Sequence, residues 1–191
     1  KGVPAVVAPT FAIANSMHHM NFAGSLSLSP RTYTQVLQEQ CRAIAAHGFK
    51  RIAIINGHGC NTAPTKTGII DINNELGFPV YFMSYILVDE RPFLETQTGM
   101  NHACESETSL MLAYDESLVD PIYKETSGYG GGCTAWEDEG VLHTFHRMEA
   151  HTVNGVMGNS CAATKEKGEA IADVNTKKLV EILSDDVIWQ L

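Results

Sequence analysis

The chain has 191 residues, of which 44% are hydrophobic and 18% are charged, and its net charge is −9 at pH 7. This composition is typical of a folded globular chain and excludes disordered, collagen-like and disulfide-rich classes. The acidic balance, with no basic run longer than Lys177-Lys178, argues against a nucleic-acid partner. No apolar segment approaches the roughly 18 residues that a membrane helix needs, so we expect a cytoplasmic protein without membrane contact.

The five cysteines form an odd, scattered set without a CxxC pair: Cys41, Cys60, Cys104, Cys133 and Cys161. This pattern favours reduced thiols over a disulfide framework. We expect most of them to be small buried apolar side chains.

The sequence begins with Lys1 and has no initiator methionine. Residues 3–9 (VPAVVAP) follow at once and form an apolar run that predicts a buried strand. A strand at the first residues is an unusual native start. We therefore expect residues upstream of Lys1 that were processed away, lie outside the given sequence, or belong to another chain.

A helix is predicted to follow, since Ser29 suits the N-cap, Pro30 the first helical position and Gly48 the residue just past the end. Residues 50–56 (KRIAIIN) predict a second buried strand, because the run is apolar and rich in β-branched side chains.

A second helix is expected over residues 62–76, capped by Gly77, and a third strand over residues 79–85. Strands and helices that alternate in this way predict right-handed crossovers and a mainly parallel sheet with helices on both faces. Residues 103–114 and 162–183 have further helical character. With no repeat and no linker, residues 1–191 are expected to form a single domain.

Histidines occur in the segments that follow each predicted strand, at residues 15–22, 56–61 and 101–109. Ligands of open parallel sheets bind outside the carboxyl ends of the strands, so these segments are expected to converge. His58 lies between two glycines, which let the backbone approach a ligand and present an imidazole to zinc, manganese or iron. The alternative is a loop histidine hydrogen-bonded to its own turn.

In the third segment, a helix that begins near His102 would place His102 and Glu105 on one face, three residues apart. Glu107 would point elsewhere, as a capping carboxylate for free N–H groups or as an acceptor behind the site. The geometry favours Glu105 as the site carboxylate. The alternative is a solvated acidic first turn, which the apolar residues 110–113 disfavour.

Residues 54–61 (IINGHGCN) and 102–109 (HACESETS) together resemble the paired signatures of the creatininase (creatinine amidohydrolase) family. Residues 8–10, 19–26, 155–159 and 167–168 resemble further segments of that family in the same order. The resemblance implies a three-layer α/β/α sandwich with a mainly parallel sheet, usually in a homo-oligomer. It also implies one or two divalent metals (Zn, Mn or Fe) that activate water against a non-peptide C–N bond of a small molecule.

Carried over by position, the resemblance makes His58 and Glu105 metal ligands and His102 the group that shuttles a proton to the leaving nitrogen. His19 matches a loop histidine for substrate or subunit contacts. Cys60 stands where some members have a glutamate, and is either a thiolate ligand or a small packed side chain. With Asn61 and Trp136, His19 and Cys60 complete the expected substrate-binding set.

The resemblance implies that the family's remaining ligands, a Glu, a His and an Asp, lie before the point that matches residue 1, and nothing in residues 1–191 replaces them. Either a preceding segment supplies them, or the chain as written does not hold a metal firmly. His58 and Glu105 alone fall short of the roughly four positions that a zinc site fills. Two alternatives remain open: a hydrolase that opens the ring of a keto-inositol or keto-sugar, and a non-catalytic family member.

Overall fold

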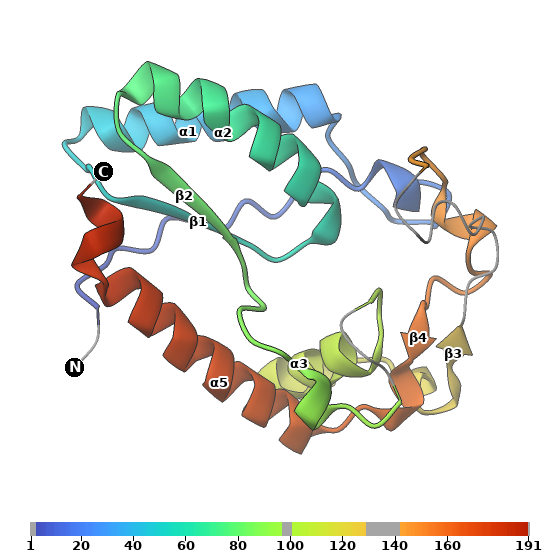
Figure 1. The fold of residues 1–191 in the computed structure, drawn as a ribbon. Coiled ribbons are helices and arrows are strands. Elements are labelled where there is room, and N and C mark those ends of the chain that lie inside the picture. The colour runs from blue at the N-terminus through green and yellow to red at the C-terminus, as the bar shows by residue number, and fades with distance from the viewer. Residues whose placement is uncertain (1–2, 97–100, 129–141, 191) are drawn as a thin grey trace. The chain divides into compact units, whose positions relative to one another are not determined.

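The computed structural model describes residues 3–96, 101–128 and 142–190 (Figure 1). Two compact units emerge: unit 1 comprises residues 1–17, 25–87 and 178–191, and unit 2 residues 18–24 and 88–177. The single domain over residues 1–191 stays a prediction. Among the described residues, no helix is both long and apolar enough to cross a membrane.

The helices and strands of the described ranges are, in chain order, α1 Pro30–Ala46, β1 Ile52–Asn56, α2 Thr62–Leu76, β2 Val80–Ser84, α3 Glu105–Asp115, β3 Ser127–Gly128, β4 Gly158–Asn159 and α5 Lys165–Ser184. Short 3-10 turns separate several of them, including Met17–His19, Gly59–Asn61 and Met148–Ala150.

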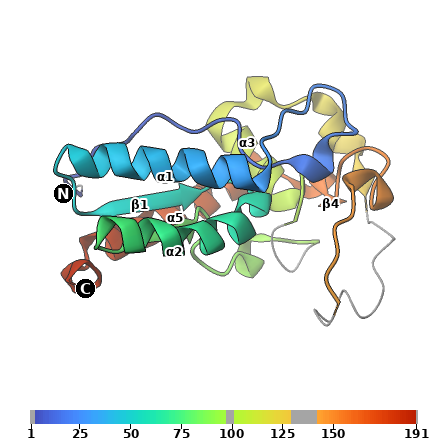
Figure 2. The same cartoon turned by 90° about the horizontal axis from the view of Figure 1, so that it is seen from above.

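Unit 1 is an α/β unit built on a βαβ crossover. β1 pairs with β2 in parallel, in a register that runs from Ile52 opposite Val80 to Asn56 opposite Ser84. Helices α1 and α2 lie side by side along this pair (Figure 2). The buried core between them consists of four side chains: Cys41, Ile52, Ile72 and Val80. The parallel strand pair and its covering helices confirm the expected α/β class.

The helix ends of unit 1 lie where the capping residues predict. The Ser29 hydroxyl accepts a hydrogen bond from the Thr32 N–H at 3.2 Å, and Pro30 begins α1. Gly77 caps α2 with φ 70°, a left-handed conformation that glycine adopts without a steric penalty.

The prediction of a strand over residues 3–9 is wrong. These residues form no strand, and the side chains of Val6 and Val7 are 80% and 90% exposed. Pro4 and Pro9 have no N–H to donate to a ladder, and within the described ranges β1 and β2 pair only with each other. An apolar run without a strand beside it therefore remains extended chain.

Unit 2 places α3 against the first turns of α5. A Cβ at Gly168 would lie 1.8 Å from the Ser109 carbonyl oxygen, so only glycine permits this approach of the two helices. Ser109 Oγ also accepts a hydrogen bond from the Thr164 N–H at 3.1 Å. Strands β3 and β4 form a short antiparallel pair beside these helices.

No disulfide joins the described cysteines to one another, and the reduced state stays a prediction. Cys41, Cys60, Cys104 and Cys161 are all free thiols. Cys41 and Cys104 are buried, Cys60 is half-buried, and Cys161 is exposed. Cys133 lies outside the described residues.

Candidate active site

An asparagine network holds the loop that carries His58 in unit 1. Asn56, the last residue of β1, donates to the His58 carbonyl at 2.8 Å and accepts from the His58 N–H at 3.2 Å. Its side-chain oxygen also accepts from Asn61 Nδ2 at 3.2 Å. Asn15 closes the network, because its N–H donates to Asn61 Oδ1 and its Nδ2 donates to the Cys60 carbonyl, both at 3.0 Å.

The His58 ring is half-buried, and its Nε2 lies 3.0 Å from Ser16 Oγ. Burial lowers the pKa of His58, and a backbone hydrogen bond at Asn15 offsets this only in part. The imidazole is therefore neutral at pH 7, which is the state that binds a metal. Asn15, Ser16 and Asn56 lie in the segments that the sequence predicts to converge, but their contacts with this loop were not predicted. For Asn56, the position at the end of a predicted strand was the available signal.

Cys60 and Asn61 have structural contacts in the same loop. Burial raises the pKa of the Cys60 thiol to about 11, so a thiolate is not the resting form. Both amide atoms of Asn61 are engaged within the network, and its carbonyl accepts from Thr65 Oγ1 at 2.6 Å. Because a bound metal deprotonates a coordinating thiol, Cys60 as a thiolate ligand and Cys60 as a small packed side chain both stay predictions.

Glu105 begins α3 in unit 2, is fully buried, and is held by four donors. Oε1 accepts from the Glu95 N–H at 2.9 Å and from Lys167 Nζ at 2.6 Å. Oε2 accepts from the Thr96 N–H at 3.0 Å and from Thr96 Oγ1 at 2.7 Å. Burial raises the pKa of Glu105, but the Lys167 ammonium and the N–H donors outweigh it, so the pKa lies below its ordinary value.

Lys167 is the partner that sequence analysis missed, although residues 167–168 were noted as a family-like segment. Its Nζ also bonds to the Ala162 carbonyl at 2.7 Å and to Glu95 Oε1 at 2.8 Å. Burial lowers the pKa of Lys167, whereas Glu105 and Glu95 raise it above its ordinary value overall. The ion pair joins α3 to the first turn of α5.

His102 precedes α3, so the argument that His102 and Glu105 share a helix face is wrong. The cause is Ala103, whose φ of 49° lies in the left-handed region and interrupts the helical path. Glu107 Oε2 accepts from the Ala103 N–H at 2.6 Å. Glu107 therefore accepts from a backbone N–H just before the N-cap of α3, which is the acceptor role among the two expected for it.

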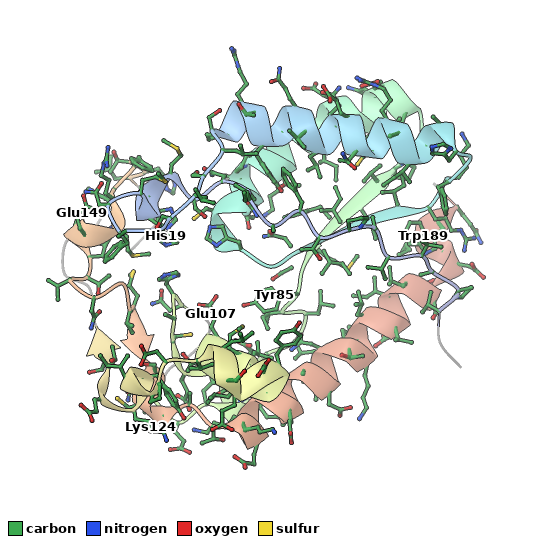
Figure 3. The ribbon with its side chains drawn as sticks, turned by 180° about the vertical axis from the view of Figure 1, so that it is seen from behind. His19, Tyr85, Glu107, Lys124, Glu149 and Trp189 are labelled. Carbon is green, nitrogen blue, oxygen red and sulfur yellow. The ribbon has the colours of Figure 1, made fainter. Side chains whose placement is uncertain are left out.

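His19 lies beside His102 in unit 2, with the ring centroids 4.4 Å apart and the planes inclined by 29°. Figure 3 shows His19 and Glu149 on neighbouring segments of this unit. Trp136, the remaining residue of the expected substrate-binding set, lies outside the described residues.

The expected ligands occupy different units, His58 in unit 1 and Glu105 in unit 2. That they share one metal stays a prediction. Across residues 3–96, 101–128 and 142–190, no group of three or more His, Cys, Asp or Glu side chains is arranged to hold a metal ion. His58 fits a divalent cation as a neutral nitrogen donor, whereas each oxygen of Glu105 already accepts two hydrogen bonds.

The comparisons with known proteins agree with one another. A model of the family described as "Creatininase: Creatinine amidohydrolase" matches residues 1–183. A creatinine amidohydrolase from Pseudomonas putida is 27% identical in an alignment of 190 positions that covers 87% of this chain and 67% of the relative.

Two solved structures show the same similarity. A protein from Bacteroides fragilis NCTC 9343, provisionally described as a creatinine amidohydrolase, matches with TM-score 0.79 and 25% identity over 90% of this chain and 67% of its own. A creatinine amidohydrolase (creatininase) matches with TM-score 0.72 and 27% identity over 86% of this chain and 67% of its own. Related creatininase structures include a manganese form, a Zn-Zn form of a variant and a variant complexed with creatine.

The fold and the family match define the class as an α/β amidohydrolase. The chain belongs to the creatininase family, since the family model covers nearly all of it.

Proposed function

We propose that this chain is a metal-dependent amidohydrolase that breaks a non-peptide C–N bond, in a cyclic amide or formamide, of a small molecule. Family membership supports the reaction class. The observation that carries the proposal is the neutral, half-buried His58 imidazole, presented by a glycine-flanked loop at the carboxyl end of β1. That is the place where parallel sheets bind ligands.

The cofactor in this proposal is a divalent metal, Zn, Mn or Fe, as in the Zn-Zn and manganese forms of related creatininases. When bound, such a cation lowers the pKa of a water molecule and stabilises negative charge on a carbonyl oxygen. His58 would hold it through an imidazole nitrogen. That Glu105 is a second ligand stays a prediction, and its carboxylate would have to release at least one of its four donors.

His102 is assigned to the leaving group. An imidazole near neutral pKa donates a proton efficiently to a departing nitrogen. The His102 backbone is held on both sides: its N–H donates to Asn101 Oδ1 at 3.0 Å, and its carbonyl accepts from the Met157 N–H at 2.8 Å. Substrate contacts by Cys60, Asn61 and Trp136, a homo-oligomeric state and a cytoplasmic location complete the proposal, and the substrate or subunit contact expected for His19 from the sequence stays a prediction.

A substrate panel tests the proposed reaction. Creatinine, small formamides and keto-inositols are offered to the full chain with zinc, with manganese, and after chelation. The proposal predicts metal-dependent turnover of a cyclic amide or formamide. Turnover of keto-inositols alone would replace it with the ring-opening alternative, and a protein that binds the metal but turns over none of the panel would favour a non-catalytic member.

A further inference from the structure

The His19 and His102 rings stack on each other in unit 2, with their centroids 4.4 Å apart. The His18 ring is tilted by 50° against that of His19, with a centroid distance of 3.9 Å. We propose that His19 is a positioning residue, which fixes the ring orientation of His102 by stacking on it and does not itself contact the substrate. This inference rests on the proposed role of His102 as proton donor.

Both histidines lie near one segment, residues 147–157. The side chain of Asn21, two residues after His19, accepts a hydrogen bond from Arg147 and donates one to Glu149. At the other end of the segment, the Met157 N–H donates to the His102 carbonyl. The segment therefore has contacts close to each of the two stacked rings.

Hydrogen bonds hold the backbone of His102, but they do not set the orientation of its imidazole ring. The χ2 torsion of histidine is broad, so a flat neighbour that stacks on the ring favours one ring plane. The hydrogen bond from the Ala103 N–H to Glu107 fixes only the peptide that follows His102. The face of His19, inclined by 29°, supplies the flat neighbour.

A stacked aromatic pair contributes enough energy to change catalysis measurably. The usual magnitude for such pairs corresponds to about a two- to tenfold change in an equilibrium or rate. Misorientation of His102 affects proton transfer in the transition state and leaves ground-state binding unchanged, so the loss is expected in kcat and not in KM.

The kinetic test compares His19→Ala with His19→Phe, which keeps a flat ring but has no nitrogen. We expect His19→Ala to lower kcat about two- to tenfold with KM unchanged, and His19→Phe to restore most of the loss. In a His102→Ala background, His19→Ala should cause no further loss, since the two residues act as a unit. A raised KM that His19→Phe does not rescue would overturn the proposal in favour of a substrate contact.

A second readout does not depend on activity. NMR signals of the His102 ring, recorded on the metal-free full chain, should shift in His19→Ala and return toward wild type in His19→Phe. The control is His47→Ala, at the exposed end of α1, which should leave them unchanged. Unchanged His102 signals in His19→Ala would overturn the stacking role, whereas full activity of His102→Ala would instead refute the proposed proton donor.

Discussion

Lys167 Nζ lies 2.6 Å from Oε1 of Glu105, a carboxylate with no exposed surface. The pair links the start of α3 to the first turn of α5, and the same carboxylate holds the backbone of Glu95 and Thr96. A buried carboxylate with four donors has a structural role in unit 2, whatever further role a metal would give it.

Removal of the ammonium should destabilise the protein strongly. Lys167→Met leaves a buried carboxylate without its cation, which typically costs about 3–5 kcal/mol. Urea unfolding at pH 7 measures the loss, and the double variant with Glu105→Gln should recover part of it. The exposed pair of Lys178 and Glu181 is the control, because Lys178→Met should cost at most about 1 kcal/mol. Equal losses in the two lysine variants would contradict the assignment.

The same pair predicts a pH dependence of stability. The pKa of Glu105 is lower in the folded state than its ordinary value of 4.5, so its contribution is complete above pH 4.5. It is lost as pH falls through the folded-state pKa. We expect the difference in unfolding free energy between wild type and Glu105→Gln to shrink on acidification below pH 4.5. A difference that stays constant from pH 7 to pH 3 would show that the carboxylate is not held in its charged form.

Gly168 should not tolerate a side chain. Gly168→Ala places a Cβ against the Ser109 carbonyl of α3, and such overpacking typically costs about 1–3 kcal/mol. Thermal unfolding measures the effect, with Gly57→Ala as the matched control because a Cβ there meets no atom within 4 Å. The close approach of α3 and α5 would be refuted by an unchanged melting temperature in Gly168→Ala.

Local sequence signals predicted the helices of unit 1. Features that depend on contacts between residues far apart in the sequence were not predicted correctly. Ser29 and Gly77 cap their helices through neighbouring backbone groups, so a short window of sequence suffices. Residues 3–9 had the composition of a strand, but a strand also needs a neighbour to pair with. The residues of the run alone do not show whether a neighbouring strand is present to pair with it.

In the candidate site, too, local features were predicted and long-range contacts were not. The glycines around His58 indicated a ligand-presenting loop from sequence alone. The partner of Glu105 is 62 residues away in sequence, so no local spacing indicates Lys167. The left-handed Ala103 was likewise unpredictable, because alanine rarely adopts that conformation and here the Glu107 carboxylate bonds to its N–H.

The asparagine network should control the loop that presents His58. Asn56→Ala removes the four hydrogen bonds of the Asn56 side chain and leaves partly buried partners unsatisfied, at a typical cost of about 1–3 kcal/mol. We expect lower stability by urea unfolding and weaker metal binding. Asn74→Ala, at an exposed position of α2, is the control and should change neither. Unchanged metal affinity in a folded Asn56→Ala protein would show that metal binding does not depend on the asparagine network.

The most direct test of the central claim is a calorimetric titration of zinc and manganese into the metal-free full chain, with turnover measured on the same samples. The account predicts that His58→Ala abolishes both metal binding and turnover, whereas His47→Ala retains both. Wild-type metal affinity in a folded His58→Ala protein, or full turnover by wild type stripped of metal, would contradict it.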